Sequence, residues 1–263
     1  MRLSLAVVAA TCLSLSTGAS AQAPAAQAPV PPVPSCQELA AALRTVTTND
    51  ARLKDWPNLA RYRDSNVTTA AGPVDVVFMG DSITDSWPQP RFGAFFPGKK
   101  YVGRGISAQT TPQMLLRMRA DVLNLKPKVV VILAGTNDIA GNTGPMTDEE
   151  IEGNLMSMSE LAVANGVKVV LSSITPVSEY HMATPAAVPQ TTLRPMKRIL
   201  AINAWMKSYA AAHGHVYLDY FPAMTDAAGL LKAEFSADDL HPNAAGYSVM
   251  APLAEAAIAQ AMR

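Results

Sequence analysis

A serine at the end of an apolar run is the residue with the clearest chemical potential in this sequence. The run from Val74 to Met79 is followed directly by Gly80-Asp81-Ser82. If the run forms a buried strand, Ser82 lies at its carboxyl end, where open α/β sheets bind ligands. A serine hydroxyl becomes an effective nucleophile when a nearby base takes its proton. Ser82 is therefore a candidate nucleophile, and its alternative role is to cap the helix that follows.

A base and a carboxylate occur together near the other end of the chain, in Asp238-Asp239-Leu240-His241-Pro242. A histidine accepts the serine proton best when a carboxylate holds its second ring nitrogen and stabilises the imidazolium. His241 is the candidate base, and Asp238, three residues earlier, is the candidate carboxylate. Asp239 is interpreted as a solvent-facing loop or helix-cap acid. These residue types predict nucleophilic catalysis if the fold brings Ser82 and His241 together.

Two further motifs lie between these ends, Gly105-Ile106-Ser107-Ala108-Gln109-Thr110-Thr111 and Gly135-Thr136-Asn137-Asp138. The four motifs in this order resemble those of the SGNH (GDSL-type) hydrolase superfamily. A lone Gly-Asp-Ser is weak evidence, whereas four ordered motifs at the ends of apolar strands are specific. The resemblance extends over about residues 73 to 262. Within the superfamily, the motifs are most similar to the branch of platelet-activating-factor acetylhydrolase-like and lysophospholipase-like proteins.

The resemblance implies a carboxylic ester hydrolase that forms an acyl-enzyme on Ser82. It also implies an oxyanion hole made by the backbone N–H groups of Ser82 and Ala108 and by the side-chain amide of Asn137. The family usually has glycine where Ala108 stands, and alanine keeps the N–H but disfavours a positive φ. No metal or organic cofactor is implied. The substrate is expected to be a small-molecule or glycan ester, with lysophospholipids, short-chain esters, thioesters and acetylated polysaccharides all left open.

Two other functions are compatible with parts of the sequence. Gly103-Arg104-Gly105-Ile106-Ser107-Ala108 fits the dinucleotide fingerprint G-x-G-x-x-G/A, and Asp121 follows as a possible ribose-binding acid. An oxidoreductase would normally carry this fingerprint in the first strand-to-helix turn, which here holds Gly80-Asp81-Ser82. A glycan-binding module without catalysis would leave the four motifs without a role. Hydrolysis of a short-chain nitrophenyl ester would separate an esterase from both alternatives.

Short apolar runs alternate with longer amphipathic segments from Val74 onward. The pattern predicts strands at 74–79, 101–103, 129–134, 167–174 and 216–218, and helices at 112–125, 148–164, 194–211 and 243–261. The run Val129 to Leu133 lacks polar alternation, so helices should cover both faces of the sheet. The sequence therefore predicts an α/β fold, a three-layer α/β/α sandwich. The resemblance adds a five-stranded parallel sheet in flavodoxin-like order.

The resemblance leaves the first 72 residues outside it. Residues 1–21 carry one charge, at Arg2, then an apolar stretch and Ala19-Ser20-Ala21, which is the pattern of a signal peptide cleaved near Ala21. Residues 22–35 have the composition of a Pro/Ala-rich linker. Residues 36–72 are expected to be a helical lead-in, with a helical pattern from 35 to 63 that Pro57 must interrupt. The hydrolase domain is then residues 73–263.

Composition narrows the expected partners and location. Cleavage of the signal peptide predicts an exported protein, periplasmic or secreted. Removal of Arg2 leaves 20 Lys and Arg residues against 21 Asp and Glu residues, a balance that offers no footprint for nucleic acid. No second long apolar stretch follows, so no stable membrane insertion is expected. The oligomeric state is left open.

Overall fold

A computed structural model of the protein describes residues 35–184 and 186–263. The chain divides into two units, residues 1–45 and 46–263, and the larger unit contains the sheet and all four motifs. The predicted signal peptide, and the predicted linker except Ser35, lie outside the described residues.

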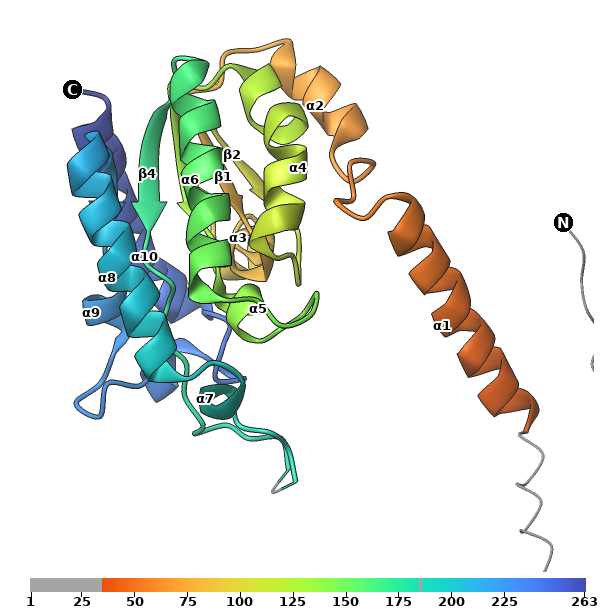
Figure 1. The fold of residues 1–263 in the computed structure, drawn as a ribbon. Coiled ribbons are helices and arrows are strands. Elements are labelled where there is room, and N and C mark those ends of the chain that lie inside the picture. Colours follow the sequence, from red (N-terminus) through yellow and green to blue (C-terminus); the bar gives the residue numbers. More distant parts are fainter. Residues whose placement is uncertain (1–34, 185) are drawn as a thin grey trace, which may run out of the picture. The chain divides into compact units, whose positions relative to one another are not determined.

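Five parallel strands form one sheet in the order β2-β1-β3-β4-β5. Figure 1 shows three of them, β1, β2 and β4, among the helices that cover the sheet. The strands are β1 (Val76–Gly80), β2 (Tyr101–Gly105), β3 (Val129–Leu133), β4 (Lys168–Ser172) and β5 (Val216–Leu218). Every residue of β1 and of β3 is buried, as expected for central strands covered on both faces. This is the flavodoxin-like order, so the predicted α/β fold and sheet order are confirmed.

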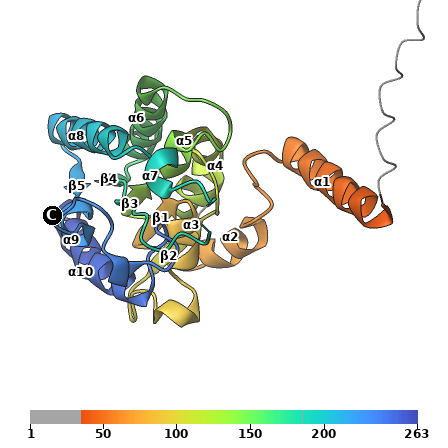
Figure 2. The ribbon, with the colours of Figure 1, turned by 90° about the horizontal axis from the view of Figure 1, so that it is seen from below.

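The two faces of the sheet carry separate apolar clusters, because successive side chains of a strand point to opposite faces. Val77 and Met79 of β1 pack with Met114, Leu155 and Ile202, which belong to three different helices. These helices are α4 (Thr111–Asp121), α6 (Asp148–Ala164) and α8 (Met196–His213). On the opposite face, β1 packs against α10 (Ala244–Ala261), and Figure 2 shows α10 and α8 on opposite sides of the strands.

Short elements connect the larger ones. They are α3 (Ser82–Ser86), η1 (Pro90–Phe92), η2 (Leu123–Leu125), α5 (Thr136–Ile139), α7 (Gln190–Leu193), α9 (Phe221–Met224) and η3 (Ala233–Phe235). Helix α6 has the predicted bounds, and the capping box of Thr147 and Glu150 defines its start. The helix predicted over 112–125 ends earlier, at Asp121, and continues as the separate turn η2.

The predicted lead-in contains two helices, α1 (Cys36–Lys54) and α2 (Arg63–Ala70). Helix α1 ends three residues before Pro57, and residues 55–62 form turns rather than the predicted helix. Helix α2 lies within the predicted lead-in of 36–72 but beyond the helical pattern of 35–63, and it contacts α4 and η2. Among the described residues, none of the helices is both long enough and apolar enough to cross a membrane.

Candidate active site

The predicted site residues lie where three adjacent strands end. Ser82 is the first residue of α3, directly after β1, and Asn137 lies in α5, directly after β3. Ala108 lies in the loop between β2 and α4. The strand order reverses at β1 and β3, and in such sheets ligands bind in the crevice at this switch point. The fold therefore gathers residues from separate motifs at one edge of the sheet.

Two glycines allow α3 to lie directly against the strand ends. A Cβ atom on Gly80 would lie 2.1 Å from Thr84 Oγ1. A Cβ atom on Gly105 would lie 2.0 Å from the backbone nitrogen of Asp85. Both distances are far below van der Waals contact, so only glycine fits. Gly105 therefore serves the packing of β2 against α3, next to Ser82.

Ser82, His241 and Asp238 form a continuous line of hydrogen bonds. Ser82 Oγ lies 2.8 Å from His241 Nε2. His241 Nδ1 lies 2.7 Å from Asp238 Oδ2. With the proton of the neutral imidazole on Nδ1, that nitrogen donates to Asp238 and Nε2 is free to accept from the serine hydroxyl. The structure thus brings together three residues from opposite ends of the domain, each within hydrogen-bonding distance of the next.

The loop before α10 holds Asp238 in place. Its Oδ1 accepts hydrogen bonds from the backbone N–H of His241 at 2.8 Å and from that of Leu240 at 3.2 Å. Burial alone would raise the pKa of Asp238, but the hydrogen bonds from the His241 ring and backbone hold it well below its usual value. Asp238 therefore stays ionised in mild acid, as a carboxylate hydrogen-bonded to the imidazole of His241.

Asn137 is buried and its amide is fixed in orientation. Its Nδ2 donates to the carbonyl oxygen of Gln109 at 3.0 Å, and its Oδ1 accepts from Asn142 Nδ2 at 3.0 Å. The first bond uses one of the two Nδ2 protons, which leaves the second available to a ligand. Asn137 lines the same cavity as Ser82 and His241.

Ala108 has a φ of +66°, in the left-handed region that favours glycine. The turn that the family builds on glycine is therefore made here with alanine. An L-residue in this conformation costs about 1–2 kcal/mol. The backbone N–H of Ala108 has no hydrogen-bond partner within the described part of the chain. The N–H of Ser82, at the first position of α3, likewise has no partner within its own helix.

A cavity of about 650 Å³ lies over these groups. It is lined by Ser82, Ser86, Arg91, Phe92, Ser107, Ala108, Asn137, Arg194, Ala237, Asp238, Leu240, His241, Pro242 and Asn243. All five predicted site residues belong to this lining. Among the aromatic residues near Ser82, Phe92 lines the cavity, whereas Trp87 is buried against Phe78 and Tyr247.

Comparison with known proteins decides the family. The sequence profile described as "GDSL-like Lipase/Acylhydrolase family" matches residues 78–249. The chain belongs to this family. This confirms the resemblance seen in the four motifs and makes the protein an acylhydrolase of the esterase and lipase class.

Two solved structures agree with the assignment, and one curated protein of undescribed activity matches part of the chain. A protein of Bacteroides fragilis NCTC 9343 assigned as an acylhydrolase is 38% identical, with a TM-score of 0.70, and the match covers 79% of this chain and 99% of that one. A protein of Streptococcus pneumonia assigned as a platelet activating factor is 27% identical, with a TM-score of 0.67 and coverage of 82% and 99%. The uncharacterized lipoprotein YqeF of Bacillus subtilis (strain 168) is 36% identical over 78 residues, which are 28% of this chain and 32% of that protein. The match therefore spans about a third of that lipoprotein.

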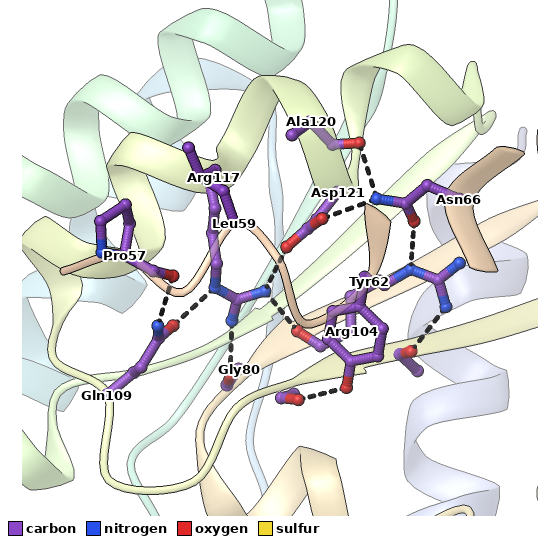
Figure 3. A network of polar contacts seen from close by, with 12 residues as sticks. Pro57, Leu59, Tyr62, Asn66, Gly80, Arg104, Gln109, Arg117, Ala120 and Asp121 are labelled. Atoms are coloured by element: carbon purple, nitrogen blue, oxygen red, sulfur yellow. Dashed lines mark hydrogen bonds and ion pairs between the residues drawn. The ribbon is translucent and has the colours of Figure 1, made fainter. Parts of the chain in front are cut away.

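The acylhydrolase has a buried cation beneath the site that sequence reasoning missed. Arg117 of α4 is fully buried and donates to the carbonyl oxygens of Gly80 and Arg104, at 2.9 and 2.8 Å (Figure 3). Its Nε donates to Gln109 Oε1 at 2.6 Å, and Asp121 balances its charge at 3.1 Å. Arg117 thus connects the end of β1, before Ser82, with the loop that carries Ala108.

The contacts of Arg117 also argue against a dinucleotide-binding role for residues 103–108 and Asp121. Asp121, which would bind a ribose hydroxyl, is buried and accepts from Arg117 Nη1 and, at 2.7 Å, from Asn66 Nδ2. Gly105 of the fingerprint is required for packing against Asp85. The glycine pattern therefore has a structural origin.

Arg194 is a second residue that the sequence did not single out. It is buried, lines the cavity, and donates from Nε to the backbone oxygen of Thr136 at 3.1 Å. Burial lowers the pKa of Arg194, whereas the charges of Asp81 and Asp238 raise it. Arg194 lies between α7 and α8 and belongs to none of the four motifs. No sequence pattern therefore marked it as a site residue.

The interpretation of Asp239 as a solvent-facing acid is wrong. Its side chain is buried and accepts from Ser178 Oγ at 2.6 Å and from the backbone N–H groups of Tyr180 and His181 at 2.9 and 2.7 Å. Asp239 Oδ1 also lies 3.2 Å from His181 Nδ1. Asp239 therefore fixes the loop of residues 178–181, because its several acceptor sites satisfy backbone groups that no helix or strand satisfies.

Proposed function

We propose that this acylhydrolase is an exported serine esterase that cleaves carboxylic esters through an acyl-enzyme on Ser82. The observation that carries the proposal is the line of hydrogen bonds from Ser82 Oγ through His241 to Asp238. In such an arrangement His241 takes the proton of Ser82, and Asp238 stabilises the imidazolium that forms.

In the first half of the reaction, Ser82 Oγ attacks the ester carbonyl carbon while His241 Nε2 takes the hydroxyl proton. Asp238 stabilises the imidazolium, and the negative charge on the carbonyl oxygen is met by the N–H groups of Ser82 and Ala108 and by Asn137 Nδ2. Collapse of the tetrahedral intermediate breaks the bond to the alcohol oxygen, which takes the proton from His241 Nε2. The alcohol departs and leaves the acyl group on Ser82.

In the second half, water replaces the alcohol. His241 Nε2 takes a proton from water as the water oxygen attacks the acyl carbon, and the same donors hold the oxyanion. The intermediate expels Ser82 Oγ, which takes the proton back, and the carboxylic acid is released. No step in this scheme requires a group other than the residues named.

Export is supported by the signal-peptide pattern of residues 1–21 and by the partial match to a lipoprotein. We infer that the globular part, residues 73–263, acts outside the cytoplasm on small-molecule or glycan esters. Residues 22–35 would act as a linker and residues 36–72 as a lead-in.

The test compares neighbouring aspartates with nitrophenyl acetate as substrate. Asp238→Asn should lower kcat by ~10²-fold or more, because the imidazole loses the carboxylate that orients it. Asp239→Asn is the matched control and should keep kcat within ~10-fold while lowering the free energy of unfolding, since Asp239 holds a loop. The reverse result would assign the orienting role to Asp239, and the absence of hydrolysis by the wild type would refute the esterase.

A further inference from the structure

A second cavity, of about 820 Å³, adjoins the first and shares Ser107 and Ala108 with it. We call it the Trp56 groove. It is lined by Asp55, Trp56, Asn58, Ala60, Ile106, Ser107, Ala108, Gln109, Gln113, Asn142 and Thr143. Its volume falls within the range of about 300–1,000 Å³ that is usual for small-molecule sites. The mechanism above uses only Ala108 of this lining, so most of the groove has no assigned role.

The wall that carries Trp56 is tied to the loop of the proposed oxyanion hole. The backbone oxygen of Trp56 accepts from Gln113 Nε2 at 2.8 Å. The backbone oxygen of Pro57 accepts from Gln109 Nε2 at 2.8 Å, and Gln109 directly follows Ala108 (Figure 3). Across the groove, Asn142 Nδ2 donates to the backbone oxygen of Ala108 at 3.3 Å. The groove is therefore formed before any ligand arrives.

The chemistry of the lining favours a neutral, hydroxyl-rich ligand. Most of the lining side chains carry amide, hydroxyl or carboxylate groups, so a long acyl chain would leave them without partners. Asp55 is the one charged residue among those named for the groove, and its two oxygens already accept from the N–H groups of Leu59 and Ala60. No lining cation is present to bind a phosphate group.

Three lining groups are free to contact such a ligand. Trp56 is 39% exposed and lines the groove, so its ring offers a flat apolar surface to a ligand. Within the described residues, no hydrogen bond involves the side-chain amide of Asn58, and none involves Asn142 Oδ1. An aromatic ring beside amide groups suits a sugar, because a pyranose ring has an apolar C–H face for stacking and hydroxyls at its edge for hydrogen bonds.

We propose that the Trp56 groove binds the sugar portion of a carbohydrate ester whose acyl carbon is attacked by Ser82. The proposal rests on the proposed function and names the alcohol half of the substrate. It places the acyl group in the cavity at Ser82 and the sugar on the other side of the shared residues Ser107 and Ala108.

The test compares two acetate esters, O-acetylated xylotetraose and decyl acetate, by release of acetate. The wild type should have the higher kcat/KM for the sugar ester. Trp56→Ala should lower the ratio of kcat/KM for the sugar ester to kcat/KM for decyl acetate by about 10-fold or more. Trp56→Phe should lower this ratio less, since phenylalanine keeps part of the flat surface. Asn58→Gly should also lower the ratio, and its backbone φ of +56° accepts glycine without strain.

The control is Asn165→Ala, a surface asparagine at the end of α6 that lines neither cavity. This variant should leave both rates unchanged. A measurement on the wild type tests the groove even if Trp56→Ala does not fold. Unacetylated xylotetraose should inhibit hydrolysis of the sugar ester competitively.

The outcomes separate the two proposals. A wild type that cleaves decyl acetate, prefers it to the sugar ester and is not inhibited by xylotetraose would overturn the assignment of the groove alone. An unchanged ratio in folded Trp56→Ala and Asn58→Gly would do the same. A wild type that cleaves no ester, nitrophenyl acetate included, would overturn the proposed function and with it this inference.

Discussion

Asn142 holds Asn137 by a hydrogen bond of 3.0 Å from its Nδ2 to Asn137 Oδ1. This bond, together with the one that Asn137 Nδ2 donates to the backbone of Gln109, settles which end of the Asn137 amide is the donor. An amide fixed in this way meets a developing oxyanion without reorganising.

Removal of Asn137 should therefore act on the transition state. Asn137→Ala should lower kcat by ~10²-fold or more with little change in KM, because a charge-stabilising donor is lost. Asn142→Ala should lower kcat less, by about 10-fold, since the Asn137 amide remains but loses one restraint. Steady-state kinetics with nitrophenyl acetate measure both. Equal, small effects would make Asn137 a structural turn residue.

Ala108 offers a test of a second proposed oxyanion donor, its backbone N–H. Ala108→Gly keeps the backbone N–H and removes a side chain held at a φ of +66°. The strain of about 1–2 kcal/mol is relieved, and the greater freedom of glycine in the unfolded chain offsets part of this gain. We expect kcat to change by less than ~10-fold in either direction. A much larger loss would mean that the methyl group itself contacts the substrate or stiffens the loop.

Arg117 should hold the end of β1 and the Gln109 loop in place through its hydrogen bonds. Arg117→Lys retains a charge but replaces a planar group that donates in several directions by a single ammonium. We expect the free energy of unfolding to fall by ~2 kcal/mol or more, and kcat to fall with KM little changed, because the strand end before Ser82 and the Gln109 loop lose a common anchor. Arg119→Lys, on an exposed position of the same helix, is the control. Equal behaviour of the two variants in urea unfolding and kinetics would contradict this role.

Asp81, directly before Ser82, should make stability depend on pH. It is fully buried, its Oδ1 accepts from the N–H of Ile83, and its Oδ2 has no partner among the described residues. Burial raises the pKa of Asp81 from 3.8 to about 6. Between these values the folded protein binds more protons than the unfolded chain, so this contribution to stability is complete below about pH 4 and is lost as the pH rises through about 6.

Asp81→Asn removes this titration. The unfolding free energy of the wild type minus that of Asp81→Asn should therefore fall between pH 4 and pH 7, by at most ~3 kcal/mol for a shift of about two pKa units. Urea unfolding of both proteins at the two pH values measures this difference. A difference that stays constant, or that grows with pH, would show that Asp81 is ionised in the folded protein.

The strands of the sheet and the residues expected around Ser82 could be predicted because both depend on local sequence patterns. Apolar runs such as Val129 to Leu133 identify central strands without further information. The motifs of Ser82 and Asn137 follow such runs, and parallel strands place their carboxyl ends at one edge. His241 could be assigned because its partner Asp238 is three residues away, on the same loop.

The missed residues depend on contacts between distant segments. Arg117 reads as one more polar residue of an amphipathic helix, and only the packing of α4 under the strand ends shows that it is buried. Asp239 reads as an exposed neighbour of Asp238, yet the loop of residues 178–181 closes over it. Trp56 lies in a turn segment where a helix was predicted, and no local pattern places it beside Ala108.

The most direct test of the central claim, that Ser82 is the nucleophile, is covalent labelling with a fluorophosphonate followed by peptide mass spectrometry. We expect one adduct per chain, on the peptide that contains Ser82, with loss of esterase activity in proportion to labelling. We also expect slow labelling of His241→Ala and none of Ser82→Ala. An adduct on a different serine such as Ser107, or turnover of nitrophenyl acetate by Ser82→Ala at the wild-type rate, would contradict the assignment of Ser82.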